Sequence, residues 1–189
     1  LIAGCQNGEK ERRLPSGGII PPFAIVDHVN LAGGAVFYPG TYSSGEDQGA
    51  PPWGPLPPID DHFYFIHIAY ALWRDSGDAK FLHESIGDRS LLDRLERAFH
   101  SPASAPKTGA AVTTKERRAV GYGFQDSVYL LGSMSFTTLL RYRAARQLAS
   151  LWDWRNPAGQ LKDMAARTLL LKLEQRGWII LPARRCASP

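Results

Sequence analysis

Two adjacent carboxylates, Asp60 and Asp61, stand directly before an apolar stretch in the segment PPIDDHFYFIHIAYALWRDSGD. A carboxylate at a helix start accepts hydrogen bonds from free backbone N–H groups and offsets the helix dipole. One cap needs only one carboxylate, and adjacent like charges cost free energy unless both are used. The pair therefore fits either a helix cap or an acid/base pair at the mouth of a ligand cleft. We expect Asp61 to be the cap and Asp60 to be the cleft residue.

A second group of acidic and aromatic residues would complete such a cleft. Hydrolysis of a glycosidic bond uses two carboxyl groups, about 5–5.5 Å apart in retaining and about 6.5–9.5 Å apart in inverting enzymes. The candidate catalytic residues are Asp60, Asp61, Glu46 and Asp126. Aromatic rings have apolar faces and polar edges, which suit stacking on sugars. The predicted substrate-binding residues are Tyr38, Tyr42, Asp47, Trp53 and Tyr64.

Other site chemistries have little support in the sequence. His62 and His67 are five residues apart, so on a helix they point to different sides and make a poor metal pair. The Gly-Tyr-Gly at 121–123 is half of a nucleotide-binding fingerprint without its strand–turn–helix context. No Gly-x-Ser-x-Gly and no nucleophilic cysteine arrangement is present. The sequence therefore predicts no metal and no cofactor.

The net charge separates the C-terminal end from the rest of the chain. The 189 residues carry +4, all of it within residues 151–189, whereas residues 1–150 are neutral. Phosphate contacts are predicted for Arg167, Lys172, Arg176, Arg184 and Arg185. On a helical wheel, the face opposite the apolar one carries Arg167 as its single cation. Packing on another protein, or a solvated basic tail, therefore stays open beside DNA binding.

Apolar periodicity indicates the elements that would position these residues. Residues 61–75 predict a helix that is apolar on all sides and therefore buried. A short helix is predicted at 79–86, and another at 90–100 with one apolar stripe. The stretch FQDSVYLLG repeats the pattern of IDDHFYFIH 65 residues earlier, so a second inner helix is predicted at 126–140, continuing to about 152.

The two ends of the chain have a different pattern. Residues 15–58 are rich in Gly and Pro and predict a long loop, with small strands at 23–26 and 35–38. Asn156 before Pro157 ends the preceding helix. A helix at 160–176, a glycine and the short strand WIIL follow, which is the pattern of a winged helix–turn–helix.

Residues 17–150 resemble the six-hairpin glycosidase-like proteins. The matching stretches are GGIIPPF, FYPGTYSSGEDQG, WGPLPPIDDHFYFIHIAYALWRDSGDAKFL and RAVGYGFQDSVYLLGSMSFTTLLRYRAARQLA. The resemblance implies helical hairpins of an (α/α) barrel and activity on carbohydrate. The matching part is too short for a complete barrel, so a partial one is expected.

Residues 152–185 resemble the opening segment of a bacterial domain of unknown function found in transposase-associated and anti-phage proteins. The run GQLKDMAARTLLLKLEQRGWIILP carries this resemblance. It implies association with nucleic acid. The two resemblances meet near residue 150 without a linker, as in a fusion or an assembled chain.

Together these observations predict a mostly α fold with two units. Residues 1–150 would form a partial (α/α) hairpin domain with a long Gly/Pro-rich N-terminal loop, and residues 151–189 a basic winged-helix-like segment. The expected function is that of a carbohydrate-active, glycoside hydrolase-like protein using carboxylates at helix N-termini. The alternative is a non-enzymatic nucleic-acid-associated or assembly module.

Partners and location follow from the same observations. Carbohydrate and, through the C-terminal segment, nucleic acid are the expected partners. A homo-oligomer would cover apolar helices that a partial barrel leaves exposed. No apolar run is long enough for a membrane span. The stretch LIAGC matches the end of a lipoprotein signal but lacks the preceding charged and apolar regions, so a cytoplasmic location is favoured over an exported lipoprotein.

Overall fold

The computed structural model describes residues 1–49, 54–119 and 131–160 of the chain. Three α-helices in this part are accompanied by four small sheets, each an antiparallel pair of two-residue strands. The fold is therefore a mixture of helices and short strands. The prediction of a mostly α partial (α/α) barrel is wrong, because three packed helices beside four hairpin-like sheets are not a ring of helical hairpins.

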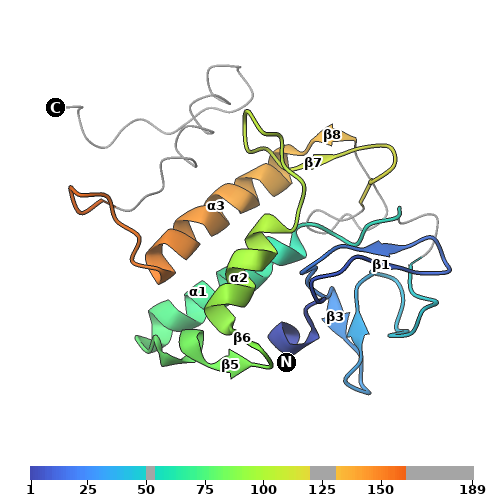
Figure 1. The fold of residues 1–189 in the computed structure, drawn as a ribbon, viewed down its shortest axis with the longest axis horizontal. Helices are drawn as coiled ribbons and strands as arrows, with labels where there is room; N and C mark the ends of the chain where they lie inside the picture. Colours follow the sequence, from blue (N-terminus) through green and yellow to red (C-terminus); the bar gives the residue numbers. More distant parts are fainter. Residues whose placement is uncertain (50–53, 120–130, 161–189) are drawn as a thin grey trace.

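The three helices are α1 (Asp61–Ser76), α2 (Leu91–His100) and α3 (Ser135–Leu151). They lie side by side, with α1 and α3 running in the same direction and α2 in the opposite one (Figure 1). The connection from α1 to α2 lies at one end of the helical layer and contains β5 and β6, and β7 and β8 lie at the other end, where α2 ends and α3 begins (Figure 1). The N-terminal segment and its sheets lie beside this layer (Figure 1).

Local signals explain where α1 and α2 begin and end. Gly77 takes the left-handed conformation (φ 67°), and its N–H donates to the Trp73 carbonyl at 2.9 Å, which ends α1. Ser90 caps α2, since its Oγ accepts from the Asp93 N–H at 3.2 Å. The helices predicted at 61–75 and 90–100 are confirmed.

The strands form four antiparallel pairs. They are β1 (Arg12–Arg13) with β2 (Ile19–Ile20), β3 (His28–Val29) with β4 (Ala35–Val36), β5 (Ser85–Ile86) with β6 (Arg89–Ser90), and β7 (Val112–Thr113) with β8 (Gly132–Ser133). Two further short helical turns, η1 (Ile2–Cys5) and η3 (Lys80–His83), are of the 3₁₀ type. The predicted long N-terminal loop therefore contains two small sheets, and the strand predicted at 35–38 is confirmed at its first two residues.

Two predicted helices differ from the structure. The helix at 79–86 is replaced by η3 and β5, because Gly87 at φ 68° turns the chain into the β5–β6 hairpin. The second inner helix was predicted from residue 126, but residues 132–133 form β8, and Gly132 has φ 92°. A residue in that region cannot belong to a right-handed helix, so α3 begins only at Ser135. Residues 120–130 lie outside the described part.

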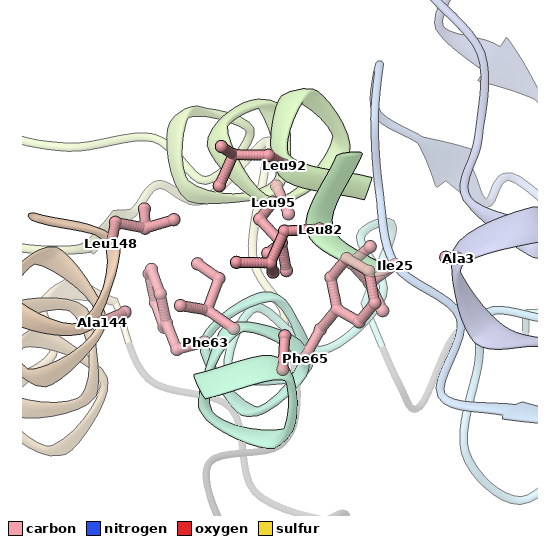
Figure 2. Packing of buried hydrophobic residues seen from close by; sticks show 12 residues of the cluster. Ala3, Ile25, Phe63, Phe65, Leu82, Leu92, Leu95, Ala144 and Leu148 are labelled. Carbon is pink, nitrogen blue, oxygen red and sulfur yellow. The ribbon is translucent and has the colours of Figure 1, made fainter. Parts of the chain in front are cut away.

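The main core lies where the three helices meet (Figure 2). Phe63 of α1 and Leu95 of α2 are both buried, and Ala144 and Leu148 complete the contact from α3. Ile25 from the N-terminal segment packs against the same cluster. A second cluster lies between the first two sheets and includes Phe37 and Tyr38. The N-terminal region thus has its own small core joined to the helical one.

One side of α1 faces solvent. Ile68 and Leu72 are 50% and 57% exposed, whereas Phe63, Ile66 and Ala69 are buried. The prediction of a helix buried on all sides is wrong, since α2 and α3 cover only part of its circumference. None of the helices in the described residues has the length and hydropathy needed to cross a bilayer.

The predicted boundary at residue 150 falls within the last turn of α3, which ends at Leu151. Residues 153–160 continue as turns, with Asn156 N–H donating to the Gln160 carbonyl at 2.7 Å. The division into 1–150 and 151–189 stays a prediction. The helix expected over 160–176 and the strand after it lie outside the described residues.

His62 is buried in α1, and within the described residues neither ring nitrogen has a hydrogen-bond partner of normal geometry. Burial lowers the pKa of His62 to about 3, with a smaller opposing effect from the Ile59 backbone. As pH falls below the ordinary value of 6.5, the unfolded chain gains a proton that the folded chain does not. The free energy of unfolding is therefore expected to fall between about pH 6.5 and about pH 3.

Replacement His62→Leu should reduce this loss, because the unfolded variant has no proton to gain at this position. Urea unfolding of both proteins at pH 7.5, 5.5 and 4.5 measures the effect, with His83→Leu, an exposed histidine of η3, as the control. Parallel pH profiles for wild type and His62→Leu would contradict the assignment.

Candidate functional site

Asp60 and Asp61 lie at the start of α1, as predicted, but Asp60 and not Asp61 holds the N-cap position. Asp60 occupies the N-cap position, is 4% exposed, and its main-chain carbonyl accepts from the N–H groups of Phe63 (2.9 Å) and Tyr64 (3.0 Å). The Asp60 side chain makes no capping hydrogen bond, and Asp61 belongs to the first turn. The expectation that Asp61 is the cap is therefore wrong.

Tyr64 is affected electrostatically by both Asp60 and Asp61 and by Arg143 of α3. Burial raises the pKa of the Tyr64 phenol, the Asp60 and Asp61 carboxylates raise it further, and the Arg143 guanidinium opposes them. The structure thus brings two of the predicted catalytic carboxylates and one predicted substrate-binding residue together at one end of α1.

The other predicted carbohydrate residues lie on the N-terminal segment. Tyr38 is fully buried and its hydroxyl donates to the Pro55 carbonyl at 2.8 Å, so the ring has no free face for a sugar. Tyr42 is 84% exposed and its ring meets His28 edge-on at 5.9 Å. Glu46 and Asp47 are exposed, and the Asp47 carboxylate accepts from the Ser43 hydroxyl. These contacts hold the loop rather than join it to the carboxylates of α1.

Several predicted site residues lie outside the described part of the chain. They are Trp53, Asp126, Arg167, Lys172, Arg176, Arg184 and Arg185. The structure neither places them in a site nor excludes them from one, and they stay predictions.

The structure shows a basic groove between α1 and α3 that the sequence did not indicate. It has a volume of about 330 Å³. All of its lining residues are polar or carry a polar group: His67, Tyr70, Arg74, Tyr142, Arg143, Arg146, Gln147 and Ser150. Three are arginines, and the described lining contains no carboxylate. We call this surface the α1–α3 groove.

His67 lies at the centre of the hydrogen bonds in the groove. The Arg143 Nη2 atom is 2.9 Å from Nδ1 and 2.6 Å from Nε2 of the imidazole. The Gln147 Nε2 atom is 2.8 Å from the same Nδ1. A guanidinium is a donor only, so the imidazole nitrogen that it contacts must carry a lone pair, which a neutral imidazole has and an imidazolium lacks.

The electrostatics of the groove agree with a neutral imidazole. Burial lowers the pKa of His67, and the positive charges of Arg143 and Arg74 lower it further. Arg74 has a carboxylate neighbour, because its Nε donates to Asp75 at 2.8 Å on the exposed end of α1. Arg143 contacts the His67 imidazole instead of a carboxylate, and its positive charge acts on the Tyr64 hydroxyl together with the negative charges of Asp60 and Asp61.

A larger hollow lies on the other side of α2. It has a volume of about 490 Å³ and is lined by Pro22, Phe23, Asp93, Glu96, Arg97, His100 and Ser101. Arg97 stacks over the Phe23 ring at 4.7 Å and its Nε donates to Asp93 at 2.8 Å. The Ser101 hydroxyl donates to the Pro22 carbonyl at 2.7 Å. The Arg97 guanidinium in this hollow is therefore already paired with Asp93. The contacts of Arg97 and Ser101 hold the N-terminal segment against α2.

Arg143 is the groove residue that sequence reasoning could have approached. The apolar pattern predicts Arg141, Arg143 and Arg146 on the outer side of a helix. This is right for Arg143 and Arg146, which are exposed, and wrong for Arg141, which packs against Phe99. What no local pattern contains is the neighbour of that side: His67 is 76 residues away in the chain. Within the described residues, no group of His, Cys, Asp and Glu suits a metal ion.

Comparison of the chain with protein-family models, with curated proteins and with solved structures found no match. The resemblances of residues 17–150 and 152–185 therefore stay predictions. The groove geometry is the observation from which a function can be argued.

Replacement Arg143→Gln should raise the pKa of His67, since it removes one of the two charges that disfavour the imidazolium. The measurement is an NMR titration of the His67 ring protons in wild type and variant. Arg13→Gln, which removes an exposed arginine from β1, is the control and should leave the titration unchanged. An equal His67 pKa in all three proteins would show that the Arg143–His67 contact does not exist in solution.

Proposed function

We propose that the protein is a non-enzymatic nucleic-acid-binding module that holds a phosphate backbone in the α1–α3 groove. The observation that carries this proposal is the groove lining itself: three arginines, no described carboxylate, and one guanidinium, Arg143, that rests on a neutral imidazole. A guanidinium held by a neutral imidazole rather than by an ion pair can form charge-assisted hydrogen bonds to a phosphate oxygen.

The other groove residues suit the same ligand. Arg143 can donate two parallel N–H hydrogen bonds to one phosphate, the bidentate arrangement that arginine forms with phosphate and carboxylate groups. The tyrosines at 70 and 142 supply hydroxyl donors and ring faces on either helix. Trp152, 48% exposed, directly follows α3 and is two residues beyond the lining residue Ser150. Interleaved arginines and aromatic rings are typical of surfaces that bind single-stranded nucleic acid.

His67 gives the proposed site a pH dependence. The neutral imidazole holds Arg143 when no ligand is present. A phosphate close to His67 would favour the imidazolium and raise its pKa. Binding is therefore coupled to proton uptake and should become tighter as pH falls toward the His67 pKa.

Replacement Arg143→Gln should weaken binding of a single-stranded oligonucleotide about 10-fold or more, since hydrogen bonds to charged groups contribute about 1.5–3 kcal/mol. The slope of log K against log salt should also decrease by about 0.7, the value for one phosphate contact on a single strand. Fluorescence anisotropy with a labelled oligonucleotide at several salt concentrations measures both quantities.

The control for this experiment is Arg13→Gln, which removes the same charge from a surface outside the groove. If both variants lose affinity equally, binding reflects only net charge and the groove is not the site. If wild type binds no oligonucleotide at low salt, the proposed function is wrong.

Glycoside hydrolysis is the second candidate, and one observation favours it. Asp60 and Asp61 both act on the Tyr64 hydroxyl at the start of α1. Two carboxyl groups with different surroundings are what acid/base catalysis requires, and Asp60 is buried whereas Asp61 is half-buried.

If this candidate is right, wild type hydrolyses a nitrophenyl glycoside, and Asp60→Asn and Asp61→Asn each lower the rate at least about 100-fold, as loss of a general acid or base does. Asp75→Asn is the matched control, since this carboxylate is exposed at the other end of α1. A screen of nitrophenyl glycosides in which wild type never exceeds the buffer rate would remove the candidate.

A further inference from the structure

Tyr70 lies between positive charges along the α1–α3 groove. On α1, the lining residues His67, Tyr70 and Arg74 follow one another at intervals of three and four residues, the spacing that places positions on one face of a helix. Because a helix rises about 1.5 Å per residue, Tyr70 lies about 4.5 Å beyond His67 and about 6 Å before Arg74 along the axis. Arg143 contacts His67 from α3. The groove therefore presents a cation, an aromatic ring and a second cation in this order.

The ring of Tyr70 is held in place by Trp73. The two ring centroids are 5.7 Å apart, and the ring planes are tilted by 46°. Trp73 is partly buried and packs against the main core. Tyr70 is half-buried and lines the groove, so part of its surface stays open to a ligand. A ring that is already held loses little conformational freedom when a ligand stacks on it, which lowers the entropic cost of binding.

Both flanking arginines keep N–H groups for a ligand within the described residues. Arg143 contacts His67 through Nη2 alone, so its other N–H groups can reach a phosphate while it stays on the imidazole. Arg74 contacts Asp75 through Nε alone, and an exposed ion pair of this kind contributes little to stability. Neither contact has to break when a phosphate oxygen approaches.

We propose that the groove binds one unpaired nucleotide, with its base stacked on Tyr70 and its two flanking phosphates at Arg143 and Arg74. This inference rests on the proposed function, because it requires a phosphate backbone in the same groove. In a nucleic acid strand each nucleoside is joined to a phosphate on either side, so the order of cation, ring and cation matches the order of phosphate, base and phosphate. Stacking on an aromatic ring accepts every base, but a base inside a duplex is not accessible to it.

The first experiment compares two labelled single strands of equal length by fluorescence anisotropy: one with bases and one with an abasic sugar at every position. The abasic strand keeps every phosphate and has no base to stack. Wild type should bind the strand with bases about 5- to 150-fold more tightly, the range for one stacked base.

The second experiment tests the two phosphate positions by displacement of the labelled strand. A nucleoside 3′,5′-bisphosphate has one phosphate on either side of the base, whereas the 5′-diphosphate carries a similar charge on one side only. The bisphosphate should displace the strand at a lower concentration, because only it reaches both arginines. Replacement Arg74→Gln should remove this difference between the two nucleotides.

Replacement Tyr70→Leu should bring the dissociation constants of the two strands within about twofold of each other, since no ring remains for stacking. Tyr70→Phe is the matched control: it keeps the ring, loses only the hydroxyl, and should keep the preference for the strand with bases. Circular dichroism and thermal unfolding establish that Tyr70→Leu folds, and Tyr70→Met is the second variant if it does not.

The outcomes separate this inference from the proposed function. Equal affinity of wild type for both strands, with salt-dependent binding that Arg143→Gln weakens, overturns the inference and leaves the proposed function standing. A preference for bases that survives in Tyr70→Leu, or is lost in Tyr70→Phe, also overturns it, as does equal displacement by the two nucleotides. No binding of either strand overturns both.

Discussion

Arg141 ties the three helices together through contacts that a smaller residue could not make. Its guanidinium stacks over Phe99 of α2 at 4.3 Å, lies 6.0 Å from Phe63 of α1, and donates to the Phe99 carbonyl at 2.8 Å. The Phe63 and Phe99 rings meet edge to face at 6.2 Å. Burial lowers the pKa of Arg141, but the last turn of α2 and two aromatic faces favour the charged form. This contact joins α3 to both α1 and α2 at one place along their length.

The packing of α3 against α1, to which Arg141 contributes, also determines which side chains line the α1–α3 groove. On α3, Ala144 and Leu148 continue the buried side that Arg141 begins, whereas Arg143 and Gln147 lie on the side that meets His67. A shift of one residue along α3 would turn these side chains away from the imidazole, because successive helix positions are about 100° apart. Core and groove are therefore two sides of one helix pairing.

Local chemistry made part of this structure predictable. The ends of α1 and α2 follow from Gly77 and Ser90, whose conformations are set by neighbours in the chain. The apolar repeat after residue 126 was misleading because hydropathy does not reveal a glycine with positive φ, and Gly132 breaks the predicted helix. The site was the least predictable part. Asp60 and Asp61 were visible as a pair, but the His67–Arg143 contact depends on tertiary packing alone.

The shared direction of α1 and α3 has an effect on any charged molecule that lies along them (Figure 1). The peptide dipoles of α1 and α3 add along the groove, and the shorter antiparallel α2 opposes only part of their sum. The end near Asp60 is the positive pole and the end near Gly77 the negative one. The electrostatic potential therefore changes along the groove from one end to the other. A bound chain whose negative charge is unevenly distributed would have a different electrostatic energy in its two orientations. Polarity of this kind is a property of the backbone, and no single side-chain replacement removes it.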